Sequence, residues 1–339
     1  MSATVNLAEA IKAPFGTIFA DKMAMAHFKN GAWTDFTMEP FQDLKMSPAS
    51  HVLHYASACF EGLKAHRQAD GVYTFRLDAH MARLHKSSGL LCLPQPSPEM
   101  AAEMIRASIR ACKNWVPDAP GSLYIRPTLI GTLNSIGAAA SPSTEALFYI
   151  LLSPVGDYFS KGPKPLRLLL DEEMRTAPFF GMAKAGGNYA SALGKIMDAR
   201  KEYQVDQVLF APDGDVQETG AANFLLINDK EILTKNLTSS FLHGITRDSL
   251  IKLAGDHGYK ITERAFSPDE LAEWIKTGEA ALSGTAAVLS GVGTIIYRGK
   301  ELTVGDGQVG PNTNRLRQAL LDVQRGKAED RYDWMEKIF

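Results

Sequence analysis

The chain has 339 residues, of which 45% are apolar and 22% charged, and its net charge at neutral pH is −2. This composition is typical of a globular protein, and so small a net charge argues against a nucleic-acid partner or a polybasic membrane contact. The length predicts two domains. Cys59, Cys92 and Cys112 are far apart and odd in number. They therefore argue against a disulfide framework or a zinc site and favour a reducing compartment.

The first residues lack the basic start and apolar core of a signal peptide, and no apolar run is both long and uninterrupted enough to span a bilayer. We therefore expect a cytoplasmic protein. Residues 1–20 predict an irregular arm. Asn30-Gly31, between the apolar segments 23–28 and 32–37, predicts a β-hairpin. Residues 51–65 alternate partly and predict a strand that a glycine interrupts.

Asp78 is expected to cap a helix that ends near Leu90. Ser97, followed by a proline, predicts the start of a second helix, because serine caps helices and proline suits their first position. Two apolar runs of strand length follow, at residues 122–130 and 146–152. The second is apolar enough to be buried on both faces of a sheet.

A proline- and glycine-rich stretch then separates two strand-like runs, and it predicts the domain boundary. We expect a small N-terminal domain over residues 1–153, a linker over 154–165 and a larger C-terminal domain over 166–339.

In this C-terminal part, a helix is predicted soon after Lys184, with Tyr189, Leu193, Ile196 and Met197 on its apolar side. Thr246 is the expected cap of another helix. Residues 267–270 form a capping box that we expect to be purely structural. Strands are predicted at 166–170, 207–210 and 223–227, a small-residue loop at 282–288 and a final helix at 312–324.

The segment around Lys184 carries the clearest chemistry. The lysine lies among small residues, Gly181-Met-Ala-Lys-Ala-Gly-Gly-Asn-Tyr189, with no carboxylate nearby in the sequence. Small neighbours leave room for a flat ring, and a desolvated lysine becomes a usable nucleophile because its pKa falls. A single lysine before a helix is more simply a solvated surface residue, so the segment alone leaves both interpretations open.

Eight sequence motifs, taken in chain order, favour the chemical interpretation of Lys184 over the solvated one. They are Leu53-His-Tyr-Ala with Cys59-Phe-Glu-Gly-Leu-Lys64; Phe75-Arg through Met81-Ala-Arg83-Leu; Leu123-Tyr-Ile-Arg126-Pro-Thr-Leu-Ile-Gly131; Leu152-Ser-Pro-Val-Gly-Asp-Tyr158-Phe; Lys184-Ala-Gly-Gly-Asn-Tyr189; Glu218-Thr-Gly-Ala-Ala-Asn-Phe224; Gly244-Ile-Thr-Arg247; and Ser283-Gly-Thr-Ala-Ala287. Together they resemble the branched-chain amino acid aminotransferases, which are fold-type IV pyridoxal-phosphate enzymes. The resemblance runs from about residue 15 to the C-terminus.

The resemblance implies an α/β protein, α+β in each lobe, with the two-domain fold-type IV architecture and pyridoxal 5'-phosphate bound by the larger domain. It makes Lys184 the Schiff-base lysine, Glu218 the carboxylate beside the pyridine nitrogen and Tyr189 the partner of the ring hydroxylate. It assigns the phosphate to Arg83, Ile245, Thr246 and Thr285. Taken singly, these threonines are more simply caps or loop residues, and Arg83 a surface arginine.

The resemblance also implies a substrate pocket whose aromatic wall suits aliphatic side chains. Its members are Phe15, Tyr55, Phe60, Tyr124, Tyr158 and Ala221, with Ala286 and Ala287 offering backbone N–H groups to the α-carboxylate. Arg126 is the expected partner of the second carboxylate of glutamate. Burying an unpaired arginine in an apolar strand is costly, and a structural ion pair is the alternative. Tyr55 would reach the other subunit's pocket, which implies a homodimer.

The expected reaction is reversible amino transfer between leucine, isoleucine or valine and 2-oxoglutarate. A D-amino acid transaminase or an aminodeoxychorismate lyase of the same fold is the alternative, and a non-catalytic vitamin B6-binding protein is a third. Two positions depart from some family members. Ala287-Val-Leu-Ser290 stands where mammalian members carry a C-x-x-C motif, so we expect no thiol switch there, and Ala221 replaces a threonine.

Overall fold

The computed structural model describes residues 6–157 and 164–339. They form two compact units, each with its own sheet. Unit 1 comprises residues 6–157, 183–187 and 324–339, and unit 2 comprises residues 164–182 and 188–323. The chain therefore returns to unit 1 twice, around Lys184 and at its C-terminus. Most of the predicted linker, 158–163, lies outside the described residues, and the predicted domain boundaries stay a prediction.

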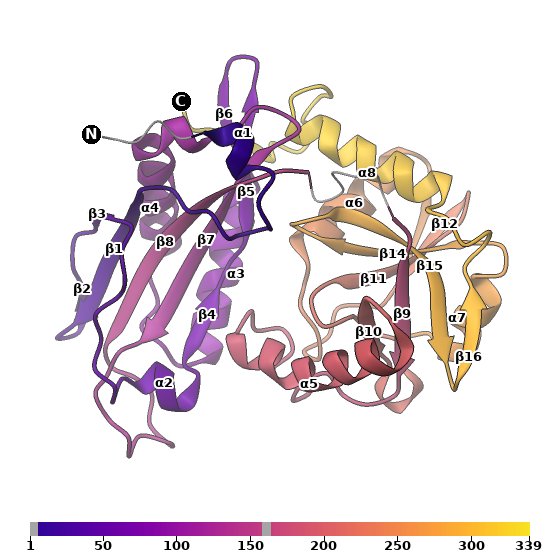
Figure 1. Ribbon diagram of the computed structural model, residues 1–339, viewed down its shortest axis with the longest axis horizontal. Helices are drawn as coiled ribbons and strands as arrows, with labels where there is room; N and C mark the ends of the chain where they lie inside the picture. Colours follow the sequence, from indigo (N-terminus) through magenta and orange to yellow (C-terminus); the bar gives the residue numbers. More distant parts are fainter. Residues whose placement is uncertain (1–5, 158–163) are drawn as a thin grey trace. The chain divides into compact units, whose positions relative to one another are not determined.

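Unit 1 is a sheet with helices, coloured indigo to magenta in Figure 1 apart from residues 183–187 and the yellow C-terminal segment 324–339. Its strands are β1 (Lys22–Lys29), β2 (Ala32–Trp33), β3 (Thr37–Pro40), β4 (Ala58–Phe60), β5 (Leu63–Gln68), β6 (Gly71–Phe75), β7 (Ser122–Gly131), β8 (Ala146–Val155) and β17 (Met335–Lys337). Its helices are α1 (Leu7–Ala10), α2 (His51–Tyr55), α3 (Leu77–Leu90), α4 (Pro98–Ala111) and the short 3-10 helix η1 (Lys113–Trp115). The strand order is β17-β6-β5-β7-β8-β1-β2, with β3 on β1 and β4 on β7. All these pairings are antiparallel.

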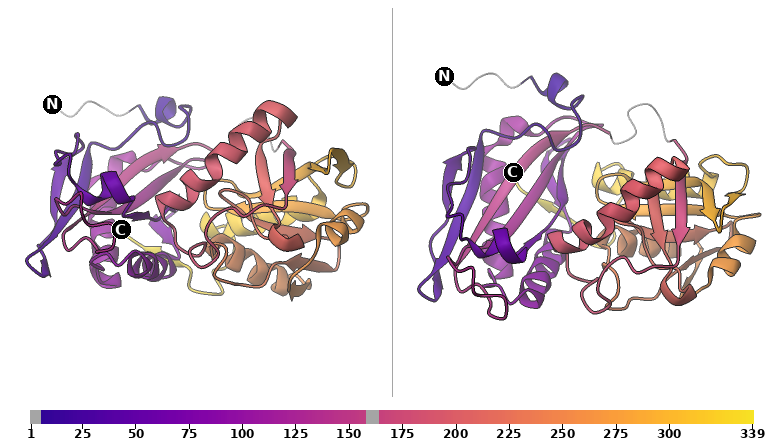
Figure 2. Two further views of the ribbon diagram at one scale, coloured as in Figure 1. Left: turned by 90° about the horizontal axis from the view of Figure 1, so that it is seen from below. Right: turned by 60° about the horizontal axis from the view of Figure 1, so that its bottom comes forward.

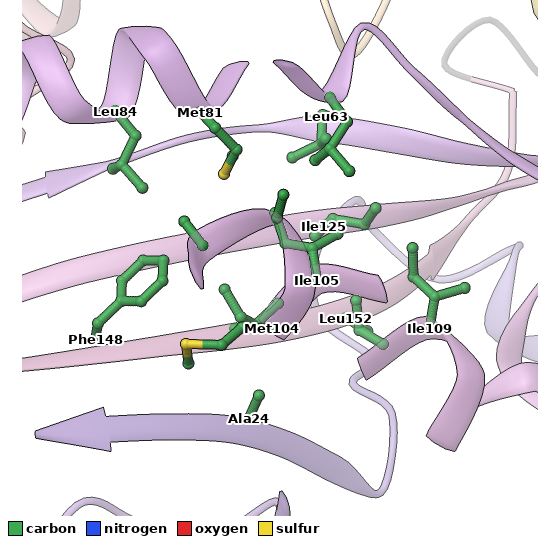
Figure 3. Packing of buried hydrophobic residues seen from close by; sticks show 14 of the residues in the cluster. Ala24, Leu63, Met81, Leu84, Met104, Ile105, Ile109, Ile125, Phe148 and Leu152 are labelled. Carbon is green, nitrogen blue, oxygen red and sulfur yellow. The ribbon is translucent and has the colours of Figure 1, made fainter. Parts of the chain in front are cut away.

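The two faces of the unit 1 sheet differ because successive side chains of a strand point to opposite faces. Leu63 on β5 and Ile125 on β7 are fully buried among the apolar residues of α3 and α4 (Figure 3). Lys64 pairs across the strands with Tyr124, so these two share the other face with Arg126. The apolar core thus occupies one face, and the predicted substrate residues of β7 lie on the opposite one.

Unit 2 holds the second sheet. Its strands are β9 (Leu166–Asp171), β10 (Gln207–Phe210), β11 (Asn223–Ile227), β12 (Glu231–Thr234), β13 (Lys260–Glu263), β14 (Glu279–Gly284), β15 (Val288–Tyr297) and β16 (Lys300–Thr303). Its helices are α5 (Gly186–Tyr203), which begins in the unit 1 segment, α6 (Ile245–Asp256), α7 (Pro268–Trp274), α8 (Pro311–Gln324) and the 3-10 helix η2 (Pro212–Gly214). The order is β10-β9-β15-β14-β11-β12-β13, with β16 on β15. β9 pairs in parallel with both β10 and β15, and β12 with β13.

Two apolar clusters hold helices against this sheet. Ala192 and Ile196 of α5 pack against Val208 and Phe210 of β10, and α5 lies beside β9 and β10 in both panels of Figure 2. Leu271 of α7 belongs to a separate cluster with side chains of β9, β11, β14 and β15. Alternating residues of β10 face different clusters, so both faces of this sheet are covered.

Several local predictions are confirmed. Asn30 and Gly31 both have positive φ angles and join β1 to β2 as a hairpin. Ser97 Oγ accepts a hydrogen bond from the N–H of Met100 at the start of α4, at 3.1 Å. Ser267 Oγ caps α7 in the same way, although the Glu270 carboxylate pairs with Arg264 rather than returning to the helix end. These signals succeed because they depend on residues close in the sequence.

Two predictions in unit 1 are wrong. Residues 51–55 form helix α2, not a strand, and the helix ends at Ala56 in the left-handed conformation. His51 fixes this turn, since its ring nitrogens lie 2.8 Å from Ser57 Oγ and 3.2 Å from Ser141 O. Asp78 does not cap α3, because the helix begins one residue earlier, after a left-handed Arg76. The Asp78 carboxylate lies instead in the first turn, where the helix dipole favours negative charge.

Two predictions in unit 2 are also wrong. Thr246 is not a helix cap but lies in the first turn of α6, and Gly244 occupies the cap position. On α5 the buried side is Asn188, Ala192, Ile196 and Ala199, while Leu193 and Met197 are 55% and 51% exposed. The buried side of α5 differs from the predicted side because its small residues, Ala192 and Ala199, pack against the sheet. A prediction from the spacing of large apolar residues does not detect such a side.

His66 on β5 is a buried titratable group, and no residue that the structure describes forms a hydrogen bond with its Nε2 atom. Burial lowers its pKa to about 3, and the charges of Lys64 and Arg325 add to this effect. The unfolded chain therefore binds a proton at this histidine below pH 6.5, whereas the folded chain does not until about pH 3. Stability from a neutral His66 is present above pH 6.5 and is lost as the pH falls through this window.

We expect His66→Phe to remove part of the acid sensitivity of the fold. Between pH 7 and pH 5, the wild-type free energy of unfolding should fall by about 2 kcal/mol more than that of the variant, since each pKa unit corresponds to ~1.4 kcal/mol. Denaturant unfolding at the two pH values measures this difference. His257→Phe, at an exposed position, is the control. Equal pH dependence in wild type and His66→Phe would contradict the argument.

Candidate active site

The backbone of Lys184 is fixed within unit 1 by β4 and α3. Its carbonyl accepts a hydrogen bond from Phe60 N at 3.0 Å, and its N–H donates to Ser87 Oγ at 3.0 Å. Ala185 forms a β-bridge with Cys59. Ala185 and its counterpart on the other side of the lysine, Ala183, are almost fully buried. The small residues noted in the sequence thus let the Lys184 segment pair closely with β4.

The ring of Phe60 lies beside two cations. Lys184 Nζ is 5.0 Å from the ring centroid, and Arg126 Cζ is 4.6 Å from it. Both distances are in the range of cation–π attraction. The ring therefore places the predicted attachment lysine and the predicted carboxylate-binding arginine around one apolar surface.

Arg126 makes its contacts with aromatic groups. Its Nη2 donates to Tyr124 Oη at 3.1 Å, and the guanidinium lies 5.4 Å from the Tyr124 ring centroid. The Phe15 ring packs edge-on against Tyr124 at 4.8 Å. Within residues 6–157 and 164–339, no group accepts a hydrogen bond from the buried Arg126 Nε and no carboxylate forms an ion pair with this arginine. The described residues therefore do not supply the structural ion pair that was the alternative for Arg126.

Arg83 is held by a buried carboxylate. Its Nε donates to Glu61 Oε1 at 2.6 Å and its Nη2 to Glu61 Oε2 at 2.8 Å. His80, one turn earlier on α3, donates from Nδ1 to Glu61 Oε2 at 2.7 Å. The Glu61 side chain is completely buried. Arg83 is thus not the surface helix arginine that its position alone would suggest.

The charge state of this cluster follows from its geometry. Burial opposes the charge of Glu61, but the Arg83 guanidinium and the His80 contact outweigh burial and hold the pKa of the carboxyl well below its usual range. Burial lowers the pKa of His80, and the positive charges of Arg83 and Lys184 lower it further. The Glu61 carboxylate raises this pKa, but it does not outweigh the other effects. At neutral pH the cluster therefore consists of a carboxylate, a guanidinium and a neutral imidazole.

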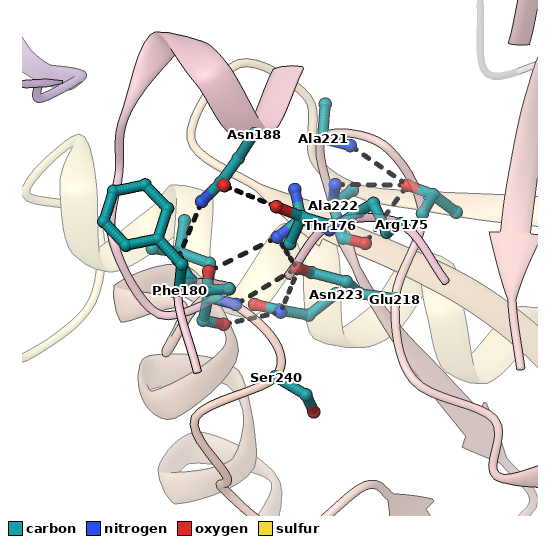
Figure 4. Close-up of polar contacts among 12 residues, drawn as sticks. Arg175, Thr176, Phe180, Asn188, Glu218, Ala221, Ala222, Asn223 and Ser240 are labelled. Atoms are coloured by element: carbon teal, nitrogen blue, oxygen red, sulfur yellow. Dashed lines mark hydrogen bonds and ion pairs between the residues drawn. The ribbon is translucent and has the colours of Figure 1, made fainter. Parts of the chain in front are cut away.

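In unit 2, Glu218 is also a buried carboxylate with several donors (Figure 4). Arg175 Nη2 lies 2.7 Å from Oε1, and the backbone N–H of Leu242 donates to the same oxygen at 3.1 Å. Asn223 Nδ2 donates to Oε2 at 3.1 Å and to Leu242 O at 2.8 Å. Arg175 and Asn223 were not among the predicted site residues, and Glu218 is not the solvated turn residue that its local sequence would allow.

The loop that carries Arg175 is tied to the first turns of α5. Thr176 Oγ1 donates to Asn188 Oδ1 at 2.7 Å, and Asn188 Nδ2 donates to Phe180 O at 2.9 Å. Ser191 Oγ donates to Arg175 O at 3.0 Å. At Gly181 a Cβ atom would collide with the backbone of Ser240. These contacts hold the loop in place, with Arg175 directed at Glu218 (Figure 4).

The start of α6 adjoins this cluster. Gly244 caps the helix without a side-chain hydrogen bond, and a Cβ atom at this position would collide with the Asn223 amide. Ile245 and Thr246 follow in the first turn, both buried. The first N–H groups of a helix have no partner within it and favour an anion. Asn223 thus connects the Glu218 carboxylate to the helix end predicted to receive a phosphate.

The predicted turn Thr285-Ala286-Ala287 joins β14 to β15 next to the same strand end. Asn223 pairs with Ser283 across the sheet, and a Cβ atom at Gly284 would be 3.9 Å from Ala221 O. Unit 2 therefore gathers Glu218, Ala221, the start of α6 and this turn around the beginning of β11.

The remaining predicted site tyrosines lie on two helices or outside the described residues. Tyr189 lies half-buried in the first turn of α5. Tyr55 lies on α2, where its hydroxyl donates to Ile136 O, and Tyr158 is outside the described residues. The sequence motifs included Glu61 and Asn223, but they did not indicate the contacts of these residues. Only the structure shows that Glu61 binds Arg83 and that Asn223 binds Glu218. Arg175 lay outside every motif, so no sequence feature would have indicated it.

No helix in the described ranges is long and apolar enough to cross a membrane. The family model "Amino-transferase class IV" matches residues 58–295. Branched-chain-amino-acid aminotransferase 2 of Bacillus subtilis is 37% identical over 335 residues, which cover 96% of this chain and 92% of that protein.

Solved structures agree with this match. The T.th. branched-chain amino acid aminotransferase with pyridoxamine 5'-phosphate is similar with a TM-score of 0.79 and 28% identity, covering 95% of this chain and all of that one. The Escherichia coli enzyme of the same name has a TM-score of 0.79 and 30% identity over 94% of this chain and all of its own. With its two-unit α/β fold, this chain therefore belongs to the class IV aminotransferases, and within them to the branched-chain-amino-acid aminotransferases.

Proposed function

We propose that this protein transfers the amino group reversibly between L-leucine, L-isoleucine or L-valine and 2-oxoglutarate. The observation that carries the substrate assignment is the arrangement around Phe60. The Lys184 amine and the Arg126 guanidinium lie against one aromatic ring, and no carboxylate among residues 6–157 and 164–339 forms an ion pair with that guanidinium. An aromatic wall suits an aliphatic side chain, and the arginine suits the second carboxylate of glutamate.

We propose pyridoxal 5'-phosphate as the cofactor, since the T.th. relative was solved with the amine form of this compound. The residues fit this group. Glu218 has donors to both carboxylate oxygens, which stabilise its charged form for a protonated ring nitrogen. The start of α6 has no side-chain cap, so its N–H groups suit a phosphate. When bound, pyridoxal phosphate supplies an electron sink for the substrate Cα carbanion.

Lys184 is the proposed catalytic residue. Its amine would hold the cofactor and would carry the proton to and from the substrate Cα. Tyr189 is assigned to the ring hydroxylate and Glu218 to the ring nitrogen. The proposed phosphate ligands are Arg83, Ile245, Thr246 and Thr285. Cation–π contact with Phe60 keeps the lysine nitrogen on one side of that ring.

The substrate pocket is proposed to contain the aromatic residues already described and a carboxylate-binding turn. Its members are Phe15, Tyr55, Phe60, Tyr124, Arg126, Tyr158, Ala221, Ala286 and Ala287. Arg126 binds the second carboxylate of glutamate, and the 285–287 turn offers backbone N–H groups to the α-carboxylate.

We further propose a cytoplasmic homodimer. Each unit exposes large apolar side chains: Leu193, Met197 and Phe179 in unit 2, and Leu53 and Ile136 in unit 1. Phe179 is 83% exposed, and apolar exposure of this kind often marks a protein interface. The three free thiols fit a reducing compartment.

The reaction is tested by incubating the protein with L-leucine, D-alanine or aminodeoxychorismate, with 2-oxoglutarate as acceptor for the two amino acids. We expect glutamate from L-leucine only. Pyruvate from D-alanine would favour a D-amino acid transaminase, and 4-aminobenzoate would favour a lyase. A yellow protein without turnover would favour a vitamin B6-binding protein.

We expect Lys184→Ala to remain a folded dimer and to lose transamination completely, because no other amine is assigned to the proton transfer. Size-exclusion chromatography and glutamate formation measure the two properties. Lys201→Ala, at an exposed position late in α5, should keep wild-type activity. Turnover by Lys184→Ala without added amine would refute the assignment.

We expect Arg126→Leu to impair the half-reaction with glutamate at least about tenfold more than the half-reaction with leucine, since only glutamate carries a second carboxylate for a charge-assisted contact. Single-turnover absorbance changes with each amino acid measure the two rates. Arg126→Lys keeps the charge but lacks the planar fork, so it should be intermediate. Equal losses with both substrates would count against the role.

A further inference from the structure

Glu61 lies at a break in the unit 1 sheet. β4 ends at Phe60 and β5 begins at Leu63, and both pair with β7. Opposite the break, β7 carries Pro127, which has no N–H to donate to a neighbouring strand. The N–H of Glu61 donates to Pro127 O at 2.9 Å. The proline thus ends the regular ladder here while the backbone of Glu61 stays attached to β7.

The carboxylate of Glu61 is directed at α3. In addition to Arg83 and His80, the Gly62 N–H lies 3.2 Å from Oε2. Both oxygens are occupied, and each accepts from one nitrogen of the same guanidinium. A bidentate contact fixes the plane of an arginine that would otherwise sample many rotamers. Glu61 therefore determines where the Arg83 guanidinium lies.

The same residues connect to the lysine. Arg83 and Ser87 are one turn apart on α3, and Ser87 accepts the Lys184 N–H. Phe60, which precedes Glu61, donates its N–H to Lys184 O. Two routes thus lead from Glu61 to Lys184, one through the backbone of β4 and one through α3. Together they fix the separation of the lysine from the Arg83 guanidinium.

We propose that Glu61 is a positioning residue for cofactor binding: it orients Arg83 toward the phosphate and holds it at a set distance from Lys184. The inference rests on the proposed function, since it needs Arg83 as a phosphate ligand. The aldehyde and the short phosphate-bearing arm of the cofactor are attached to one planar ring, so they must meet their partners within a narrow range of spacing. Orienting the arginine before binding reduces the entropy lost when phosphate arrives.

The test compares pyridoxal phosphate with pyridoxal, which lacks the phosphate, by spectroscopic titration of the full-length protein freed of cofactor. We expect Glu61→Gln to weaken pyridoxal phosphate binding tenfold or more, which corresponds to about 1.4 kcal/mol, and pyridoxal binding by less than about twofold. In an Arg83→Gln background, Glu61→Gln should add less than about twofold, because both substitutions remove one interaction.

Glu279→Gln is the matched control. Its half-buried carboxylate accepts hydrogen bonds from Asn312 and Thr313 at the start of α8, so it reports general damage from losing an acid that holds a helix start. We expect the Glu279→Gln protein to keep the wild-type ratio of the two affinities.

Three results would overturn the inference. Equal losses for both ligands would make Glu61 merely structural, unchanged affinities would make it irrelevant, and tighter pyridoxal phosphate binding would mean that its charge repels the phosphate.

If Glu61→Gln does not fold, His80→Phe takes its place. We expect this variant to show a smaller loss that is still specific to pyridoxal phosphate, and equal losses of both affinities would contradict the inference. If Arg83→Gln itself leaves pyridoxal phosphate binding unchanged, the phosphate assignment in the proposed function is wrong, which is a separate failure.

Discussion

A buried carboxylate must be matched by donors, and this constraint shapes both units. An ionised acid without partners is very costly to bury, and removing one partner of a buried pair typically costs about 3–5 kcal/mol. Glu61 satisfies the constraint with Arg83 and His80 on one helix, and Glu218 with donors from two loops and a strand end. In each case, the hydrogen bonds and ion pairs that hold the acid also hold the side chains and backbone groups that donate to it. Positioning of the proposed site is therefore a consequence of charge burial.

The parts of the fold that could be predicted are those whose cause is local. A turn at Asn30-Gly31, a cap at Ser97 and the apolar runs of β7 and β8 each follow from neighbouring residues. Helix α2 could not be predicted, because His51 is held by Ser57 and by the distant Ser141. The exposed side of α5 was missed for a similar reason, since the sheet selects which residues of that helix it accommodates.

The candidate site shows the same division. Family motifs could identify Lys184 and Glu218 as residues of interest, but not the groups that hold them. Ser87 lies 97 residues from Lys184 in the sequence, and Arg175 belongs to no motif. Gly181 and Gly244 carry no chemistry of their own, yet each provides space for a neighbouring backbone or amide. Such contacts depend on the folded chain as a whole, so they become visible only in the structure.

The role proposed for Arg126 explains how one pocket would take both an aliphatic and an acidic side chain. A guanidinium is less strongly hydrated than an ammonium group and stacks on aromatic faces, and here Phe60 and Tyr124 provide those faces. With an aliphatic substrate, these rings and the Tyr124 hydroxyl accommodate the charge without a carboxylate. With glutamate, the buried Nε offers a donor that no described residue uses. A lysine would lack this flexibility, because its compact charge requires water or an acid beside it. The proposed dual specificity thus follows from placing an arginine, rather than another cation, on an aromatic wall.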